Sequence, residues 1–333
     1  MLNICLFGAG RMAQDHAFNF HLCPETTLYG VVDPNQVAAQ KIAETYGSKI
    51  YSSPQDAFID SNIDAVAIVS SSDTHAELIL SAAKAGKGIF CEKPVDLSQE
   101  KILNCIREVE KYKIPFLLGF NRRFDPSYRS LQDQVRSGVV GDIESVTITS
   151  RDCPGPSIDY LKRSGGMFHD MTIHDFDIAR WILGEDPVEV YACGSAVIYP
   201  EIAEFGDIDT AAVILKTGSG KICQISNSRR TAFGYDQRLE VFGSSGMINA
   251  HHLLPTTVEI ADERGITRDN PYLSFPQRYA RAYQLEAEHF CRDVMNGAEP
   301  FASIYDGLKA SCIADAAKLS LDSGKPQKIV YPV

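Results

Sequence analysis

A glycine-rich turn near the N-terminus places the strongest constraint on how this chain can fold. The turn Gly8-Ala9-Gly10-Arg11-Met12-Ala13 follows the apolar run Ile4–Phe7 and opens a segment with helical spacing. In such a strand–turn–helix unit the first glycine permits the tight turn, and the second lets a pyrophosphate approach the backbone. The small Ala13 allows close packing of helix on strand, and the helix N-terminus offers N–H groups to the phosphates. The turn therefore predicts a dinucleotide-binding unit.

An acidic residue at the end of the next predicted strand, Leu28–Val32, supports this prediction. Asp33 lies 20 residues after Ala13, where a carboxylate accepts hydrogen bonds from the adenosine ribose hydroxyls. A carboxylate there repels a 2′-phosphate, and the residues that follow, Pro34–Gln36, supply no cation to bind one. We therefore expect NAD rather than NADP. The alternative role for Asp33 is that of a helix N-cap.

The first 120 residues alternate short β-rich runs with helical patterns. The expected helices are Pro34–Tyr46, Thr74–Ala85 and 98–112, and the expected strands are Ile4–Phe7, Leu28–Val32, Ala65–Val69, Gly88–Cys91 and Phe116–Gly119. This order predicts a doubly wound parallel sheet of the Rossmann type. We assign residues 1–120 to this domain.

The pattern changes after residue 121. We expect helices at 126–137, 171–183, 278–295 and 304–323, and strands at 143–149, 188–197, 210–215, 221–226, 239–242 and 257–260. Strands joined by short glycine turns are typical of antiparallel pairing. Residues 121–333 are therefore expected to form an α+β domain with a large, mostly antiparallel open sheet, which binds substrate and mediates oligomerisation. The whole chain is of the α/β class.

Composition excludes several classes of partner. The 333 residues carry a formal net charge of −11, and the basic residues form only the short pairs Arg122-Arg123 and Arg229-Arg230, so we expect no nucleic-acid partner. No apolar run reaches the roughly 20 residues of a membrane span, and Met1–Gly10 has no positive charge before its apolar stretch, unlike a signal peptide.

The nine cysteines include no Cys-x-x-Cys pair, which favours free thiols in a reducing cytoplasm.

Several further motifs carry a family resemblance that extends over the whole chain. Glu92-Lys93-Pro94 follows a predicted strand, and other matching stretches lie at 119–126, 150–152, 165–177, 206–210 and 234–238. Together they resemble the glucose–fructose oxidoreductase, inositol dehydrogenase and rhizopine catabolism family, Gfo/Idh/MocA. Within it, the likeness is strongest to bacterial inositol 2-dehydrogenases. Cys153 stands where this resemblance predicts a proline, which leaves the shape of the loop 151–156 open.

Three residues form the predicted catalytic group. Asp170 and His174 are four residues apart, so on a helix both project from one face. A carboxylate beside an imidazole fixes its tautomer and favours its protonated form, as a general base in alcohol oxidation requires. Lys93 is held in an extended turn because it precedes a proline. The resemblance implies a cis Lys93–Pro94 bond and a Lys93 that reaches the substrate hydroxyl, and it leaves open whether His174 or Lys93 is the base.

The remaining site predictions follow from the turn and from the resemblance. Arg123 and Tyr235 are predicted substrate contacts, but each has a structural alternative. Arg123 could instead form a surface ion pair, and Tyr235 could instead lie in the core. The spacing of His169 and His174 places them about 140° apart on a helix, so we assign no metal. The predicted substrate contacts are Lys93, Arg123, Asp152, Asp170, His174 and Tyr235, and the predicted cofactor contacts are Gly8, Gly10, Arg11, Met12, Asp33, Ser70, Ser71, His75, Glu92 and Lys93.

The resemblance implies NAD-dependent oxidation of a cyclic polyol, above all myo-inositol to its 2-keto derivative. The alternatives are a dehydrogenase for another inositol isomer or an aldose, a non-catalytic NAD(H)-sensing regulator, and an NAD-retaining glycosidase. The resemblance also implies a homo-tetramer, since the exposed face of an open sheet must be covered.

Overall fold

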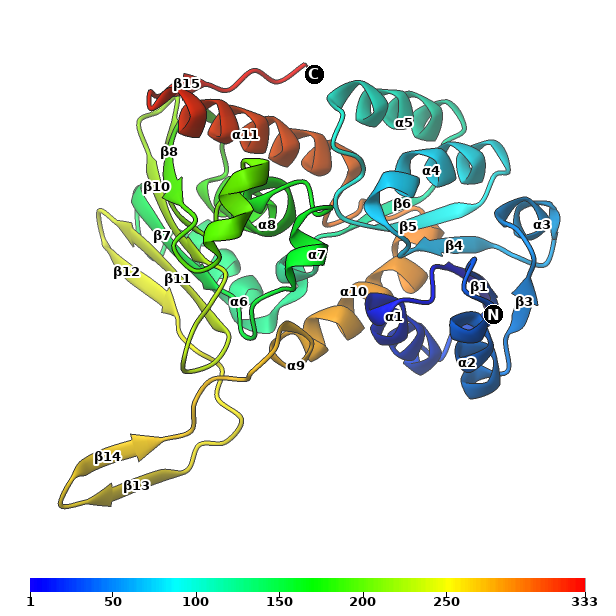
Figure 1. Ribbon diagram of the computed structural model, residues 1–333, viewed down its shortest axis with the longest axis horizontal. Coiled ribbons are helices and arrows are strands. Elements are labelled where there is room, and N and C mark those ends of the chain that lie inside the picture. Colours follow the sequence, from blue (N-terminus) through cyan, green and yellow to red (C-terminus); the bar gives the residue numbers. More distant parts are fainter. Residues whose placement is uncertain (333) are drawn as a thin grey trace. The chain divides into compact units, whose positions relative to one another are not determined.

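The computed structural model describes residues 1–332 and divides into two compact units (Figure 1). Unit 1 comprises Met1–Phe124 and Arg281–Lys309, and unit 2 comprises Asp125–Ala280 and the segment that begins at Ala310. Our expected division assigned all of 121–333 to the second domain, whereas the structure gives Arg281–Lys309 to the first. In residues 1–332, no helix has both the length and the apolar character needed to cross a membrane.

Unit 1 is built on a six-stranded sheet in the order β3-β2-β1-β4-β5-β6, in which every neighbouring pair is parallel. This is the strand order of the Rossmann fold, which confirms the predicted fold class. The sheet is covered by α1 (Arg11–Leu22), α2 (Gln36–Tyr46), α3 (Pro54–Ile59), α4 (His75–Lys84) and α5 (Gln99–Lys111), and its strands are β1 (Leu2–Phe7), β2 (Thr26–Val32), β3 (Lys49–Tyr51), β4 (Ala65–Ile68), β5 (Gly88–Glu92) and β6 (Phe116–Gly119).

The central strands of this sheet are apolar throughout because helices bury both faces. All four residues of β4 are fully buried, as expected for a central parallel strand. The short β3 and α3 were not predicted. β3 has only three residues, too few for a periodic pattern, and α3 is marked mainly by its N-cap Ser53 and by Pro54 at its start.

The segment Arg281–Lys309 belongs to unit 1 because its apolar side chains fill the core there. Phe290 of α10 (Ala280–Arg292) is fully buried, with its ring 6.3 Å from that of Phe20 and 5.9 Å from that of Phe90. Further along, Gly307 lies so close to Leu118 and Val95 that a Cβ would meet them at 2.7 and 3.3 Å. A division by sequence order misses this segment, since it returns to the first core after more than 150 intervening residues.

Unit 2 contains a seven-stranded sheet in the order β12-β11-β7-β10-β9-β8-β15. Only β7 and β10 pair in parallel, so the predicted mostly antiparallel sheet is confirmed. Its strands are β7 (Ile143–Arg151), β8 (Pro187–Ser195), β9 (Thr210–Thr217), β10 (Ile222–Ser228), β11 (Asp236–Gly243), β12 (Gly246–Ala250) and β15 (Gln327–Lys328).

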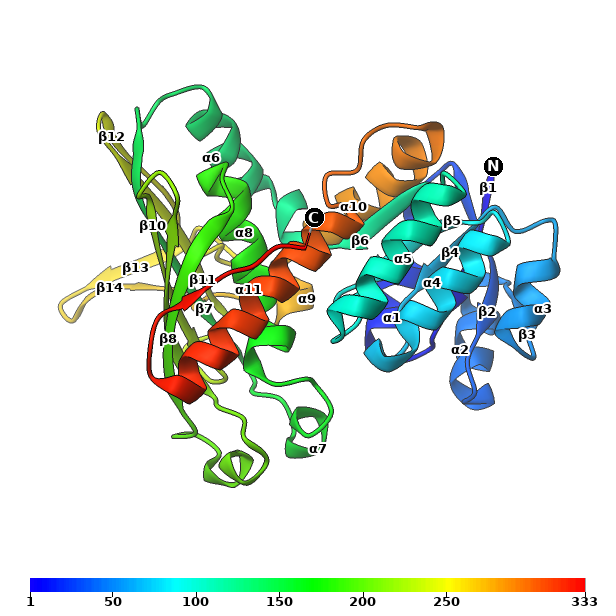
Figure 2. The same cartoon turned by 90° about the horizontal axis from the view of Figure 1, so that it is seen from above.

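One face of this sheet is covered by helices and the other is not. α6 (Pro126–Arg136) and α8 (Ile173–Leu183) lie on the same face (Figure 2), and Ser320 Oγ of α11 (Ile304–Ser323) accepts a hydrogen bond from the Ala192 N–H of β8. β9 shows the resulting alternation, with Val213 and Leu215 buried and Ile214 exposed. We call the face opposite α6 and α8 the outer face.

The predicted strand 257–260 is not part of this sheet. Its last two residues begin β13 (Glu259–Asp262), which pairs only with β14 (Gly265–Arg268) in a hairpin that projects from unit 2 (Figure 1). The remaining elements are η1 (Ser72–Thr74), η2 (Asn121–Phe124), α7 (Ile158–Leu161), the π-helical turn η3 (Phe168–Thr172), η4 (Pro200–Phe205), α9 (Phe275–Arg278) and η5 (Val294–Asn296).

The packing of Phe290 gives a stability prediction. Phe290→Ala is expected to lower the free energy of unfolding of unit 1 by about 3–5 kcal/mol, because it leaves a cavity against Phe20 and Phe90. Val37→Ala, at an exposed position of α2, is the control and should change stability by less than about 0.5 kcal/mol. Urea unfolding measures both variants. Equal stabilities would contradict the placement of this segment in the core of unit 1.

Candidate active site

The glycine turn of unit 1 has the geometry that a bound pyrophosphate requires. Gly8 has a φ of +109°, and a Cβ there would lie 2.8 Å from backbone atoms of Val69 and Ser70, so only glycine fits. Gly10 is the N-cap of α1 and makes no side-chain capping hydrogen bond, and the space around it is open. The first N–H groups of α1 are therefore available to an anion. The predicted contacts Arg11 and Met12 form the first turn of this helix.

Asp33 lies at the end of β2 beside the glycine turn. Its Oδ2 accepts a hydrogen bond from the Ala9 N–H at 2.6 Å, and its Oδ1 accepts one from the Asn35 N–H at 2.7 Å. The N-cap of α2 is Asn35, so the alternative role of Asp33 as N-cap is wrong. Each carboxylate oxygen keeps a further lone pair, and the fixed carboxylate is thus available to the hydroxyls of a ribose.

The loops after β4 and β5 are joined by a buried histidine. The imidazole of His75 lies with Nδ1 2.7 Å from the Pro94 carbonyl oxygen and Nε2 3.1 Å from that of Ser70. Burial lowers the pKa of His75. We predicted that His75 lines the cofactor groove. The structure buries the ring and makes it a connection between two loops, one of which carries the predicted cofactor contacts Ser70 and Ser71. A contact of His75 with the cofactor stays a prediction.

Glu92 and Lys93 follow at the end of β5. Glu92 Oε1 lies 2.7 Å from His16 Nε2, and its Oε2 accepts a hydrogen bond from the Lys93 N–H at 3.1 Å. Burial raises the pKa of Glu92, but the hydrogen bond and charge of His16 and the charge of Lys93 outweigh it, so the pKa lies below its usual range. The Lys93–Pro94 peptide bond is cis, as the resemblance implied. The ionised Glu92 thus fixes the backbone from which Lys93 extends.

A second carboxyl group lies buried near Glu92. Glu286 of α10 has no solvent exposure, and neither of its side-chain oxygens has a hydrogen-bond partner among the described residues. Burial, and then the charge of Glu92, raise the pKa of Glu286 well above its ordinary value. The fold therefore favours the neutral form of the Glu286 carboxyl group.

In unit 2, the predicted pair Asp170 and His174 lies where the helical geometry changes. Asp170 belongs to the π-helical turn η3, and His174 is the second residue of α8. We expected one regular helix here. Two glycines with positive φ, Gly165 and Gly166, precede the turn, and the Met167 N–H donates to Asp207 Oδ1 at 2.9 Å. Single π turns recur at functional sites because they redirect side chains.

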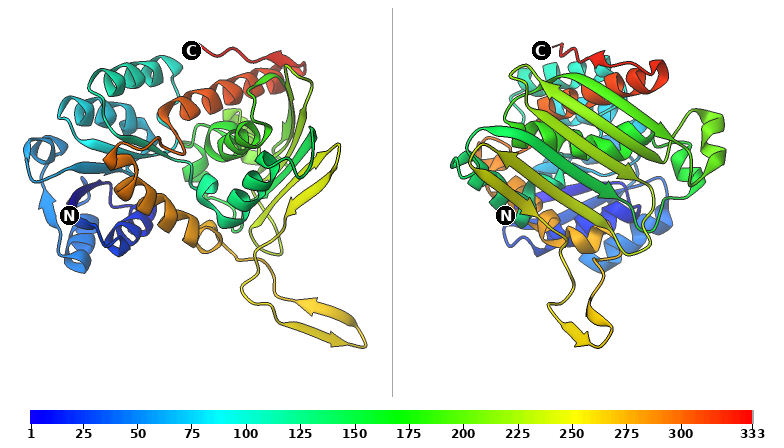
Figure 3. Two further views of the ribbon diagram at one scale, coloured as in Figure 1. Left: turned by 180° about the vertical axis from the view of Figure 1, so that it is seen from behind. Right: turned by 90° about the vertical axis from the view of Figure 1, so that its left-hand side faces the viewer.

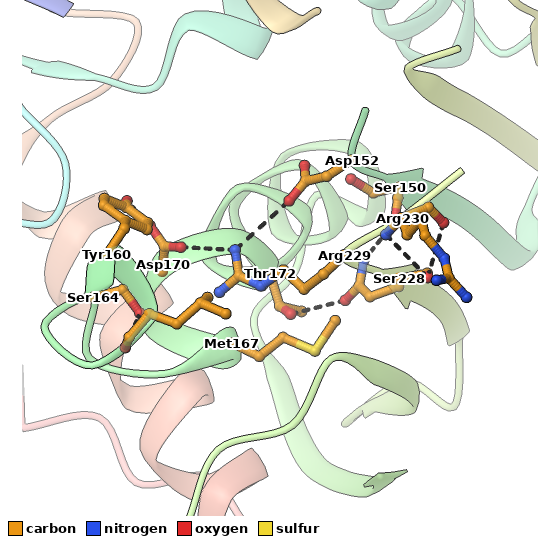
Figure 4. Close-up of polar contacts among 12 residues, drawn as sticks. Ser150, Asp152, Tyr160, Ser164, Met167, Asp170, Thr172, Ser228, Arg229 and Arg230 are labelled. Atoms are coloured by element: carbon orange, nitrogen blue, oxygen red, sulfur yellow. Dashed lines mark hydrogen bonds and ion pairs between the residues drawn. The ribbon is translucent and has the colours of Figure 1, made fainter. Parts of the chain in front are cut away.

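Asp170 is held by two donors, one exposed and one buried (Figure 4). The Tyr160 hydroxyl donates to its Oδ1 at 2.6 Å, and Arg229 Nη1 donates to its Oδ2 at 2.7 Å. Arg229 also forms an ion pair with Asp152 at 3.6 Å. Burial acts to lower the pKa of Arg229, but the charges of Asp170 and Asp152 outweigh burial and raise the pKa above its ordinary range, so the guanidinium stays charged. The predicted residues Asp152 and Asp170 therefore both form ion pairs with the buried guanidinium group of Arg229.

Buried hydrogen bonds of Asn227 connect η3 and α8 to β10. Asn227 of β10 accepts a hydrogen bond from the Thr172 hydroxyl at 2.8 Å and donates one to Asp175 Oδ2 at 2.8 Å. His169, to which we assigned no metal role, pairs with Asp315 at 2.9 Å. Within residues 1–332, no three His, Cys, Asp or Glu side chains are placed to hold a metal ion.

Arg123 and Tyr235, the other predicted substrate contacts, are both buried. Arg123 donates to the Phe301 carbonyl oxygen and to Asp306 Oδ1, the latter at 2.9 Å, within unit 1. Tyr235 packs its ring against those of Phe275 and Tyr279 in unit 2. These contacts give both residues a structural role. A role in substrate binding stays a prediction.

The residues present at the turn fit a dinucleotide. The cradle at Gly8, the open space at Gly10 and the uncapped start of α1 suit a pyrophosphate, and Asp33 lies at the adjacent strand end. Residues 2–120 match an oxidoreductase family described as having an NAD-binding Rossmann fold, and residues 128–249 match the Gfo/Idh/MocA C-terminal domain. The chain belongs to the Gfo/Idh/MocA oxidoreductase family. Unit 1 is its NAD-binding domain.

Several members of the Gfo/Idh/MocA family are similar to this chain over nearly its full length. An inositol 2-dehydrogenase of Rhizobium meliloti is 46% identical over 95% of this chain and 96% of that protein. A myo-inositol 2-dehydrogenase of Thermotoga maritima is 42% identical over 98% of both chains. The crystal structure of a myo-inositol dehydrogenase from Corynebacterium glutamicum superimposes with a TM-score of 0.94 at 38% identity, and it covers 99% of each chain.

Four residues of the two clusters were not among the predicted site residues. Arg229 was noted only as half of a basic pair, and Tyr160, His16 and Glu286 were not singled out. The position of Glu286 in a helical stripe that otherwise packs as core was the available indication, because a carboxylate at a buried position needs a reason. Nothing in the local sequence of Tyr160 indicates its partner.

The glycine turn yields a paired prediction. Gly8→Ala is expected to lower the free energy of unfolding by about 1–3 kcal/mol, because of its positive φ and the clash with Val69 and Ser70. Gly10→Ala has an ordinary φ of −72° and open space, so it should fold normally and weaken NAD binding. Urea unfolding and an NAD titration followed by fluorescence separate the two effects. Equal losses of stability would contradict this account of the turn.

Glu286 yields a prediction on pH. Its raised pKa means that the folded state holds the proton more tightly than the unfolded chain, where the value is 4.5. The stabilisation is complete below that value and is lost as pH rises from there through the raised pKa of the folded state, at up to about 1.4 kcal/mol per pH unit. Glu286→Gln cannot ionise, so its stability relative to the native protein should increase between pH 5 and pH 8, about the range in which most proteins are stable. Urea unfolding at several pH values measures this, and a constant difference would show that Glu286 is ionised in the fold.

Proposed function

We propose that this chain oxidises myo-inositol at its 2-hydroxyl to the 2-keto compound, with NAD as the hydride acceptor. The observation that carries the proposal is full-length similarity to inositol 2-dehydrogenases, at 46% and 42% identity. Lys93, Asp170 and His174 are all present, which favours an enzyme over a non-catalytic regulator on the same scaffold.

The residues of unit 1 bind and orient the cofactor. The N–H groups at the start of α1 face the pyrophosphate, and Asp33 accepts hydrogen bonds from the adenosine ribose. The same carboxylate disfavours a 2′-phosphate, which is the basis of the expected preference for NAD over NADP. When bound, NAD accepts a hydride from the carbon that bears the reacting hydroxyl.

In this proposal, residues of unit 2 accept the hydroxyl proton that the oxidation releases. As the C–H electron pair leaves as hydride, the O–H proton passes to an imidazole nitrogen of His174, and the C–O bond becomes a carbonyl. Asp170, paired with Arg229 and oriented by Tyr160, favours the resulting imidazolium. Lys93 stabilises the negative charge that develops on the oxygen. Lys93 as the base is the alternative that the family resemblance leaves open.

The test is turnover on a panel of polyols and sugars. The purified protein is incubated with NAD or NADP and with myo-inositol, scyllo-inositol, chiro-inositol, glucose or xylose, and the absorbance of the reduced cofactor is followed. We expect the highest kcat/KM with myo-inositol and NAD. His174→Ala and Lys93→Ala should each lower kcat by about 10²–10⁴-fold, whereas the exposed controls His251→Ala and Lys84→Ala should not.

Each other outcome has a distinct meaning. Preference for another member of the panel would keep the chemistry and overturn the substrate. NAD binding without net formation of NADH from any of these compounds would contradict the proposal and favour a regulator or an NAD-retaining glycosidase. Activity that survives in His174→Ala and is lost in Lys93→Ala would assign the base to Lys93.

We also propose that the protein is a cytoplasmic homo-tetramer. All nine cysteines are free thiols, seven of them buried, which suits a reducing compartment. The uncovered outer face of the sheet in unit 2 exposes several large apolar side chains, and self-association is a common way to cover such a face.

A further inference from the structure

Glu286 of α10 is a buried acidic side chain that the proposed reaction does not use. It has no solvent exposure, and neither of its carboxyl oxygens has a hydrogen-bond partner among the described residues. A buried polar group without partners is destabilising. An apolar side chain of similar volume would therefore fill this position better if Glu286 had only a packing role.

Ring contacts show which way Glu286 faces. α10, drawn in orange, runs beside α1 within unit 1 (Figures 1 and 3). Tyr283, three residues before Glu286, has its ring centre 5.6 Å from that of His16. Phe290, four residues after Glu286, has its ring centre 5.9 Å from that of Phe90. Residues three and four apart share one face of a helix, so Glu286 lies on the face of α10 that packs against α1 and β5.

Glu92 belongs to the same group of side chains. It lies on the same side of β5 as Phe90, because residues two apart in a strand share a face. Its Oε1 lies 2.7 Å from Nε2 of His16, and its charge acts on Glu286. The titratable groups that face Glu286 come from α1, β5 and α10 itself, and they are His16, Glu92 and Tyr283.

The two carboxyl groups compete for one negative charge. Each carboxylate in a buried pair disfavours ionisation of the other. Glu92 is the better site for the charge, because His16 Nε2 and the Lys93 N–H both contact its carboxylate, whereas Glu286 has no donor among the described residues. The pKa of Glu92 lies below its ordinary value and that of Glu286 well above it. Near neutral pH the pair therefore holds one proton, on Glu286.

The place of the negative charge matters for Lys93. The Glu92 carboxylate accepts the Lys93 N–H at 3.1 Å and so fixes the backbone of that residue. Ionisation of Glu286 would add a second negative charge to the same group. That charge would oppose the Lys93 ammonium as a stabiliser of negative charge on the substrate oxygen, and it would keep the ammonium protonated if Lys93 is the base. In either role of Lys93, ionisation of Glu286 lowers turnover.

We propose that Glu286 is a positioning residue for Lys93. With Glu92 it forms a carboxyl pair that shares one proton, and the proton on Glu286 confines the negative charge of the pair to the residue that contacts the Lys93 N–H. The effect on turnover rests on the function proposed above. The protonation of the pair and the reactivity of Lys93 are independent of the substrate.

The first measurement compares turnover of the native protein and of Glu286→Gln from about pH 6 to about pH 10, close to the ordinary pKa of lysine. The amide is nearly the size of the carboxyl group and does not ionise. We expect equal kcat values at low pH and a ratio of variant to native kcat that rises at high pH, by up to about tenfold per pH unit, with KM unchanged. A packing role would give a ratio that does not vary with pH.

Two further variants complete the comparison. Glu288→Gln is the matched control on the same helix, because Glu288 is partly exposed and pairs with Arg281 and Arg292. Its kcat relative to the native protein should be the same at every pH. Glu286→Met removes the same ionisation with an apolar side chain of similar volume, so the test does not depend on the amide alone. Circular dichroism checks that every variant is folded.

Two readouts need no substrate. Infrared difference spectra of the native protein at neutral pH should show a protonated carboxyl band that is absent from Glu286→Gln. In Glu92→Gln this band should be lost at a lower pH, because the neighbouring charge is gone. At high pH, acetic anhydride should label Lys93 more slowly in the native protein than in Glu286→Gln, as mass spectrometry measures, because ionised Glu286 keeps the ammonium protonated.

Each contrary result has a defined meaning. A kcat ratio that is independent of pH, or equal labelling of Lys93 at every pH, would overturn the positioning role. The absence of a carboxyl band that depends on Glu286, or an unchanged titration of that band in Glu92→Gln, would overturn the shared proton. If no compound of the panel is oxidised, the proposed function fails, and the infrared and labelling results still decide this inference.

Discussion

The missing side chain at Gly8 is the constraint on which the cofactor site depends. β1 and β4 are neighbours in the parallel sheet, and the chain must turn from β1 into α1 directly against the backbone of Val69 and Ser70. Because nothing protrudes from Gly8, the turn is tight enough for α1 to begin beside the ends of β2 and β4. Asp33 then reaches the Ala9 N–H. One absent methyl group thereby fixes the geometry of the first two loops of the site.

Ionised groups in both units are held by specific partners. In unit 2, Arg229 carries two carboxylates, Asp152 and Asp170. In unit 1, Glu92 is held by His16 beneath Lys93. Breaking a buried pair by removing one member leaves an uncompensated charge, which costs more than the pair contributes. These pairs therefore fix the orientation of the reactive side chains, whereas the stability of each unit comes mainly from its apolar core.

The features of this protein that could be predicted from the sequence are those determined by residues close together in the chain. The turn at Gly8, the apolar strand β4 and the helix expected at 304–323 each depend on residues adjacent in the chain, and the structure agrees with all three. The return of Phe290 to the core of unit 1, the pairing of Tyr160 with Asp170, and the departure of β13 from the large sheet depend on residues far apart in sequence. The π turn at Asp170 was missed for another reason, since one additional residue in a helical turn leaves the apolar period almost unchanged.

The return of Arg281–Lys309 to unit 1 has a consequence for how the protein is made. Domains generally fold as units during synthesis, the N-terminal one first. Here the first 124 residues leave the ribosome without the segment that covers Phe20 and Phe90. The apolar surface of the nascent NAD-binding domain therefore stays open until about nine-tenths of the chain has been translated. During that interval the nascent chain exposes apolar surface of the kind that chaperones bind. Because the segment that completes its core is translated late, the N-terminal domain is one of the last parts of the protein to finish folding.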